Sequence, residues 1–219
     1  MNDETLELLR RYLPPGMIEN IDQIAGLGIG GERREVTCMF VDMGSLAQFG
    51  ARGTVQMMDM LNVYMEASTR VVHSAGGLID KYMGNEIMAL YNTQLNPHAD
   101  HAERALQTAL ELRKAFSVLR AQQGIDLQQP SFRVGIHTGV ATLGNIGGVQ
   151  RRSFTALGDS INLAKRLEEH ASRGQILISE DTLNHIRAEL KRELRCDECP
   201  AIQAKGRQQL TRIYEVASA

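Results

Sequence analysis

The chain has 219 residues, a length that suits one α/β domain with a sizeable core plus a short additional segment. Its formal net charge of −2 excludes a general electrostatic attraction to nucleic acid or to anionic lipid. The sequence contains no apolar run of about 18 residues, and residues 1–9 lack the basic and apolar regions of a secretory signal. We therefore expect a cytoplasmic domain without direct membrane contact, although a longer parent protein can still be tethered to a membrane.

Residues 1–32 are predicted to form a helical linker. The apolar pattern predicts an amphipathic helix over 3–13, which ends at Pro14-Pro15 because proline cannot continue a helix. A second short helix is predicted over 16–24, and the glycines of 26–31 indicate a flexible joint. We therefore place the start of the globular domain at residue 33, with one domain over 33–219.

Strand and helix patterns follow one another through the first half of this domain. An apolar, β-branched strand is predicted over 36–41. The helix predicted over 53–74 is apolar on more than one side, so it is either deeply buried or packed against a second chain. Strands over 78–82 and 87–91 flank a hairpin tip at Gly84-Asn85. Asp100 and Glu103 then resemble a capping box that opens the next helix.

The second half continues with a strand over 132–137, a glycine-rich stretch over 139–153 and a helix over about 158–171. A strand over 175–179, a short helix over 180–188 and a hairpin-like tail that ends in Arg212–Val216 complete the chain. The order β-α-β-β-α-β predicts an α/β (α+β) fold of the ferredoxin-like kind.

The three cysteines are too few for a disulfide framework. Cys196 and Cys199 have the spacing of a zinc knuckle, but no second pair of cysteines or histidines completes four ligands. We expect a charged turn between two strands at this position. Cys38 lies in an apolar strand pattern and is expected to be a small core residue.

Polar residues occur at strand ends and on one helix face, where an apolar core does not require them. Asp42 ends the first strand, Lys81 lies in the hairpin near its tip, and Arg133 begins the strand RVGIHTG. Asn162 and Arg166 lie four positions apart, which places them on one face of a helix. Carboxylates combined with lysine, arginine and glycines suggest a metal-assisted reaction of a phosphate compound.

The combination of these stretches is more specific than any one of them. The runs ERREVTCMFVDM, GGLIDKYMGNEIMALY, DHAERALQTALEL, FRVGIHTGVATLGNIGGVQRRSFTALGDSINLAKRLE, GQILISEDTL and KGRQQLTRIYEV occur in this order. Across nearly all of 33–217 the chain thereby resembles the class III adenylate/guanylate cyclase catalytic domain, in its bacterial and soluble-type adenylate cyclase subclass. The preceding RRYLPPGMIENI resembles the helix that often links an upstream sensor to such a domain.

This resemblance implies a central, mostly antiparallel sheet and a head-to-tail homodimer with two composite sites. Its implied reaction converts ATP into 3′,5′-cyclic AMP and pyrophosphate. Two Mg²⁺ or Mn²⁺ ions per site would be held by Asp42, by the main-chain carbonyl of Met43 and by position 85. Arg166 would stabilise charge at the α-phosphoryl group and Asn162 would orient the ribose. The β- and γ-phosphates would be held by Arg133, with Lys205 as the weaker candidate.

The choice of base can be argued from hydrogen-bond chemistry within this resemblance. Adenine offers an acceptor at ring N1 and a donor at its amino group. Lys81 can donate to the first, and the Thr155 hydroxyl can accept from the second. A guanine reader needs an acceptor facing the ring N–H, which lysine cannot provide. ATP is therefore predicted as the substrate, in preference to GTP.

Position 85 departs from the family pattern, which has a second metal-binding aspartate where this chain has Asn85. An amide oxygen carries no charge, so weaker metal binding and a slower reaction are expected. Glu86 is adjacent, but neighbouring residues in a regular strand face opposite ways, so it helps only if the hairpin tip is irregular. Met-Gly-Ser-Leu also follows Asp42 where the family usually has Ile-x-Gly-Phe, a change that the Met43 carbonyl tolerates.

Several explanations of Asn85 are open. The domain is a slow but real adenylate cyclase, a catalytically impaired nucleotide-binding or regulatory domain, or a chain whose asparagine was introduced to trap substrate. A heterodimer with a chain that carries the intact aspartate would rescue one site. A pure dimerisation module would explain the linker and the apolar helix but not the phosphate-binding residues. The otherwise intact set of site residues favours the cyclase.

Overall fold

The structure is a computed structural model of the chain, and it describes residues 3–14, 17–26, 31–44, 54–122, 132–203 and 210–218. The helices, with their bounds, are α1 (Asp3–Arg10), α2 (Ile21–Gly26), α4 (Thr54–Ser74), α5 (His101–Gln122), α6 (Asp159–His170), α7 (Glu180–Asn184) and α8 (Ala188–Glu193). The strands are β1 (Glu32–Asp42), β2 (Leu78–Met83), β3 (Glu86–Tyr91), β4 (Arg133–Gly147), β5 (Arg152–Leu157), β6 (Ile176–Ser179), β7 (Leu194–Gln203) and β8 (Leu210–Ser218).

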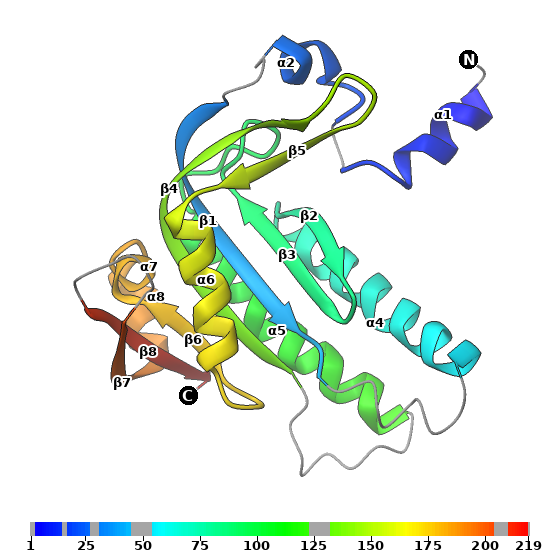
Figure 1. The fold of residues 1–219 in the computed structure, drawn as a ribbon. Coiled ribbons are helices and arrows are strands. Elements are labelled where there is room, and N and C mark those ends of the chain that lie inside the picture. Colours follow the sequence, from blue (N-terminus) through cyan, green and yellow to red (C-terminus); the bar gives the residue numbers. More distant parts are fainter. Residues whose placement is uncertain are drawn as a thin grey trace.

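The strands form one twisted sheet in the order β2-β3-β1-β4-β6-β8-β7, with β5 paired to β4 outside this path (Figure 1). Only the pairing of β4 with β6 is parallel among the described strands. The first part, β1-α4-β2-β3-α5-β4, has the strand order β2-β3-β1-β4 that a ferredoxin-like unit requires. The predicted ferredoxin-like fold with a mostly antiparallel sheet is confirmed.

Strand β1 lies inside the sheet and is covered on both faces. Alternate residues point to opposite sides, so Met39 and Val41 join the core under α4 and α5. Cys38 and Phe40 join the core under α6, as expected for Cys38. Burial on both faces over 36–41 explains why this part of the strand is almost continuously apolar in the sequence instead of alternating, whereas the charged residues 32–35 are not buried. Asp42, the last residue of the strand, is the exception.

Helix α6 packs very closely on β4. A side chain at Gly135 would place its Cβ 2.1 Å from the main-chain nitrogen of Glu168 and 2.4 Å from the main-chain oxygen of Ala164. Only glycine fits where helix and strand backbones approach so closely. This contact positions the C-terminal half of α6 beside the start of β4, where Arg133 lies.

Helix α4 is buried over its second half only. Tyr64, Ala67 and Val72 are buried there, whereas Val55 is 69% exposed and Met58 57% exposed in the first half. Deep burial of the whole helix, one of the two expected alternatives, is therefore wrong.

The glycine-rich stretch 139–153 was expected to follow the strand as a separate segment, and this expectation is wrong. β4 continues through 139–147, and β5 begins at Arg152 and pairs back onto it. The long β1 explains the difference, because its residues 32–36 supply hydrogen-bond partners for 139–143 of β4. Glycine composition alone does not reveal a partner strand.

Two local expectations near the termini of elements are also wrong. The segment 196–199 is part of strand β7, paired with β8, and is not a turn. Cys196 packs against the core under α4 and α5 while Cys199 packs against the core on the other side, so the two thiols do not face one ligand. Glu103 does not complete a capping box with Asp100; its carboxylate accepts hydrogen bonds from the main-chain N–H and the guanidinium of Arg187.

The predicted short helices are shifted or divided. The helix expected over 16–24 begins only at Ile21, and the helix expected over 180–188 is two separate helices, α7 and α8. The hairpin tip at Gly84-Asn85 and the helix over 158–171 agree with the structure within a residue or two. Among the described residues, no helix is long and apolar enough to cross a membrane.

Candidate active site

Asp42 is the last residue of β1, and it lies at the end of the sheet where β3, β1 and β4 run side by side. Its Cα is paired with that of Glu86 on β3 and with that of Arg133 on β4. The residue is only 3% exposed, so its carboxylate needs several partners. Oδ1 accepts from the main-chain N–H of Gly44 at 2.7 Å and from the side-chain amide of Asn85 at 2.7 Å.

Asn85 follows Gly84, whose φ of +65° lies in the left-handed region and makes the tight hairpin turn possible. The Nδ2 group of Asn85 donates both to Asp42 and to the main-chain oxygen of Gly44, the latter at 2.8 Å. The main-chain N–H of Met43 donates to the main-chain oxygen of Asn85 at 3.0 Å. The structure thus brings together Asp42, Met43 and Asn85, with Asn85 acting as a hydrogen-bond donor.

Two guanidinium groups contact the other oxygen of Asp42. Arg133 Nε lies 3.1 Å from Oδ2, and Arg173 Nη1 lies 2.8 Å from the same atom. Arg173 comes from the loop after α6 and has no counterpart in the sequence-based prediction. Nothing local in the sequence marks it, because the contact spans 131 positions.

Buried charges extend from this carboxylate along α6. Glu168 is fully buried, and its carboxylate contacts Arg133 Nε at 2.7 Å and Lys165 Nζ at 2.5 Å. Lys165 also contacts Glu86 at 2.6 Å. Burial raises the pKa of Glu168 although Lys165 opposes the shift. Burial alone would lower the pKa of Lys165, but its hydrogen bonds with Glu168 and Glu86 raise it.

These groups form a candidate cation site. Carboxylate oxygens of Asp42, Glu86 and Glu168 all lie within 4.8 Å of one another. Such a set of hard oxygen donors suits Mg²⁺ or Mn²⁺. Glu86 was expected to help only if the hairpin tip is irregular, and this condition is met: Asn85 lies in the turn before β3, and the Glu86 carboxylate joins that of Asp42. Arg133, Arg173 and Lys165 balance the three carboxylates in the free chain.

A second cluster lies at β2 and β5. Lys81 Nζ donates to Thr155 Oγ1 at 3.3 Å, although the two residues are 74 positions apart. Thr155 Oγ1 in turn donates to Asp80 Oδ2 at 2.9 Å, and Lys81 Nζ lies 3.1 Å from the same carboxylate oxygen. The predicted pair of Lys81 and Thr155 is therefore brought together. Asp80, which the sequence reasoning passed over, completes the cluster.

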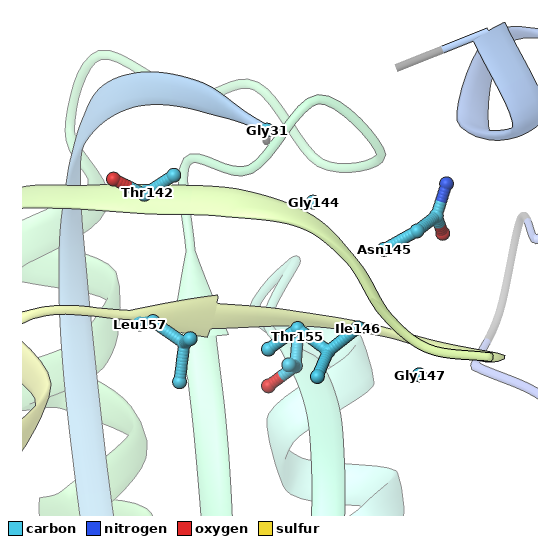
Figure 2. Close-up of a pocket in the computed structure, with 8 residues that line it drawn as sticks. All are labelled: Gly31, Thr142, Gly144, Asn145, Ile146, Gly147, Thr155 and Leu157. Carbon is cyan, nitrogen blue, oxygen red and sulfur yellow. The ribbon is translucent and has the colours of Figure 1, made fainter. Parts of the chain in front are cut away.

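A hollow of about 220 Å³ adjoins this second cluster. Figure 2 shows Thr155 and Leu157 of β5 pointing to the same side as Ile146 of β4. Ile146 and Leu157 are both largely exposed. The hollow therefore combines apolar side chains with the polar groups of Thr142, Asn145 and Thr155, an arrangement that suits a flat heterocycle with a polar edge.

Asn162 and Arg166 lie on the side of α6 that faces away from the sheet. Asn162 is exposed and Arg166 is half-buried, whereas Leu163 and Leu167 face the core. Neither polar side chain bonds to another residue in the described part of the chain. They are therefore not joined to either cluster. Lys205, the remaining predicted phosphate ligand, lies outside the described residues.

Comparisons with known proteins identify the same family as the sequence motifs. The family model described as the adenylate and guanylate cyclase catalytic domain matches residues 31–216. The adenylate cyclase of Anabaena cylindrica is 30% identical over 97% of this chain and 43% of that protein. Adenylate cyclase 1 of Rhizobium meliloti is 31% identical over 84% of this chain and 28% of that protein. The chain thus spans less than half the length of these curated relatives.

Solved structures agree with the fold. The adenylyl cyclase CyaB from P. aeruginosa has a TM-score of 0.78 at 30% identity, covering 87% of this chain and 97% of that chain. The guanylyl cyclase Cya2 has a TM-score of 0.75 at 28% identity, covering 87% of this chain and 95% of that chain. Because the family model, the relatives and the fold agree over almost the whole chain, it belongs to the family of adenylate and guanylate cyclase catalytic domains.

Proposed function

We propose that this domain is an adenylate cyclase that works at sites shared between two copies of the chain. The ribose 3′-oxygen of ATP loses its proton and attacks the α-phosphorus. The bond between that phosphorus and the bridging oxygen to the β-phosphate breaks, and 3′,5′-cyclic AMP and pyrophosphate result. The adenylate cyclases among the relatives support this choice of substrate.

The main support for the proposal is that the predicted site residues that the structure describes form separate clusters on one chain, which do not contact one another. Asn85 and Arg133 both contact Asp42, and Lys81 contacts Thr155. No bond between described residues links these two clusters, and Asn162 with Arg166 lies on an outward helix face. A single copy therefore presents half-sites, which a head-to-tail dimer would complete.

Each half-site has a separate task. Lys81 donates to adenine N1, and Thr155 accepts from the adenine amino group. Asn162 orients the ribose by hydrogen bonding, and Arg166 stabilises the charge that builds up at the α-phosphoryl group. Arg133 binds the β- and γ-phosphates with its planar fork, assisted by Lys205.

A divalent cation fits the three-carboxylate cluster. Asp42 and the Met43 carbonyl, with Glu86 in place of the missing aspartate, would hold one such ion. When bound, the ion would neutralise triphosphate charge and polarise the attacking oxygen. In the free chain Arg133 and Arg173 neutralise Asp42. Phosphate oxygens offer both guanidiniums new partners, so substrate binding frees the Asp42 carboxylate to become a ligand.

Exposed apolar side chains supply a surface for the second copy. Val55 and Met58 lie on α4, and Val140, Ile146 and Leu157 lie on β4 and β5. Scattered apolar residues are normal on a protein surface, but Ile146 and Leu157 line the hollow beside Thr155, where a half-site needs a partner. We infer that the domain spans 33–219 and that residues 1–32 link it to an upstream sensor in the cytoplasm, where ATP is available.

The direct test is production of cyclic AMP from ATP with Mn²⁺ at several protein concentrations. A dimer requirement makes specific activity rise with concentration. Mixing Asp42→Ala protein with Arg166→Ala protein should restore activity that neither variant has alone, because one mixed interface carries both intact halves. Absence of cyclic AMP at every concentration, in the wild type and in Asn85→Asp, would contradict the proposal.

One observation favours a second candidate, a nucleotide-binding regulatory domain. The amide of Asn85 donates to Asp42 and to the Gly44 carbonyl, which closes the position where the family pattern has a metal-binding carboxylate. Binding of a fluorescent ATP analogue without any cyclic AMP would support this alternative. Cyclic AMP formation by the purified chain would exclude it.

A further inference from the structure

Asp80 supports the pair of residues that reads the base, and the proposed reaction gives it no role of its own. Its side chain is only 1% exposed. Oδ2 accepts from the Thr155 hydroxyl at 2.9 Å and lies 3.1 Å from Lys81 Nζ. Oδ1 is buried and has no hydrogen-bond partner among the described residues. A buried, incompletely bonded carboxylate lowers stability, so its presence needs another explanation.

A β-bulge explains how two adjacent residues reach one cluster. The pairing of β2 with β3 passes from Ile79 opposite Ala89 to Lys81 opposite Met88, which leaves Asp80 without a partner residue. In a regular strand Asp80 and Lys81 would face opposite sides. The extra residue redirects the side chains, a use of bulges that is common beside functional sites. Both side chains consequently meet Thr155.

The hydrogen bonds of Thr155 can be counted completely. A hydroxyl has one hydrogen to donate and two lone pairs that accept. An ionised Asp80 cannot donate, so the Thr155 hydrogen must point to Asp80. Lys81 Nζ donates to one lone pair of the Thr155 oxygen, at a distance of 3.3 Å between the two atoms. One lone pair is left, and Thr155 lines the hollow beside it, so the Thr155 oxygen offers a molecule in this hollow an acceptor and no hydrogen.

We propose that Asp80 is a positioning residue that sets base selectivity, because it holds the Thr155 hydrogen and leaves an acceptor facing the base. This inference rests on the proposed function. A 6-amino group, as in adenine, donates to that acceptor. A 6-oxo group, as in guanine or hypoxanthine, would place its oxygen against the Thr155 oxygen, with no hydrogen between them. Without Asp80 the hydroxyl can rotate and donate, and a 6-oxo base is then accepted.

The test compares three triphosphates that differ at position 6 of the purine. ATP carries an amino group, ITP an oxo group and purine riboside triphosphate a hydrogen. Wild-type protein should prefer them in the order ATP, purine riboside triphosphate, ITP, measured as kcat/KM for cyclisation and as Kd by displacement of a fluorescent nucleotide. In Asp80→Leu, which has a similar shape but no acceptor for the Thr155 hydrogen, the preference for ATP over ITP should fall about tenfold, mostly through KM and Kd, since lost hydrogen-bond complementarity is of this size.

Glu103→Leu is the matched control. Glu103 is also a buried carboxylate paired with a cation, Arg187, but no contact between described residues joins this pair to Asp80, Lys81 or Thr155. This variant should keep the ATP-to-ITP ratio. Thr155→Val should lose the preference as well, because it removes the acceptor. Urea unfolding of Asp80→Leu checks that the change in ratio occurs in folded protein.

The outcomes separate the two proposals. A fall of the ATP-to-ITP ratio in Asp80→Leu, with the ratio kept in Glu103→Leu, supports the role of Asp80. An unchanged ratio in Asp80→Leu beside a lost preference in Thr155→Val overturns that role and leaves the cyclase proposal intact. If wild-type protein and Asn85→Asp neither bind nor convert any of the three nucleotides, the proposed function fails, and the role of Asp80 fails with it.

Discussion

Replacing Asn85 with aspartate should make the stability of this domain depend on a divalent cation. The Asn85 amide donates hydrogen bonds of 2.7 Å to Asp42 and 2.8 Å to the Gly44 carbonyl. Aspartate can donate neither, so both bonds are lost and a second carboxylate faces Asp42. Each hydrogen bond contributes about 1–2 kcal/mol when one partner is charged or buried. The free energy of unfolding should therefore fall by about 3 kcal/mol in the absence of metal.

A bound cation should reverse this loss. An ion at a concentration 100 times its Kd stabilises the folded state by about 2.7 kcal/mol, close to the expected deficit. The assay is urea unfolding of wild-type and Asn85→Asp protein, each in EDTA and in excess Mn²⁺. We expect a large Mn²⁺-dependent gain for Asn85→Asp, a small gain for the wild type, and faster formation of cyclic AMP by the variant.

Asn96→Asp provides a matched control. Like Asn85, Asn96 donates two hydrogen bonds through its side-chain amide. Both go to main-chain carbonyls, those of Gly76 at 2.8 Å and Leu90 at 3.0 Å. This variant should lose a similar free energy of unfolding, but Mn²⁺ should not restore it. If Asn85→Asp is as stable as the wild type in EDTA, or gains nothing from Mn²⁺, then position 85 is not part of a cation site.

Three further results are expected. Lys81→Glu should lower the use of ATP relative to GTP, because glutamate accepts where adenine N1 needs a donor; an unchanged ratio of kcat/KM values would remove Lys81 from the base pocket. Arg166→Ala should reduce cyclic AMP formation about 100-fold, the usual effect of losing a transition-state donor, with little change in urea unfolding because its side chain bonds to no other described residue; a comparable loss of stability would argue for a structural role. Burial lowers the pKa of His101 in the folded chain. As the pH drops below about 6.5 the unfolded chain therefore binds a proton at this histidine before the folded chain does, and the free energy of unfolding should fall. His101→Gln should flatten this pH dependence between pH 7.5 and 5.5, and an equally steep curve would assign the dependence to other groups.

Local patterns in the sequence were sufficient to predict most elements and the ferredoxin-like order. The first strand, the β2–β3 hairpin and helix α6 carry their own signals, since apolar periodicity, glycines and helix-compatible spacing act within a few residues. The motifs around Asp42, Lys81 and Arg166 also led to the family directly. What failed were features that depend on a distant partner. The stretch 139–147 is a strand because β1 pairs with it, and 196–199 is a strand because β8 does.

The same contrast between local sequence signals and distant contacts applies to the candidate site. The sequence alone determined which side chains could carry the chemistry, because residue type limits which atoms donate, accept or ligate. Only the tertiary structure decided that Asn85 donates to Asp42, that Arg173 from a remote loop contacts the same carboxylate, and that a bulge brings Asp80 to Thr155. Hydrogen bonds and ion pairs act over about 3 Å, and which groups come within that distance is set by strand register and helix packing across the whole chain.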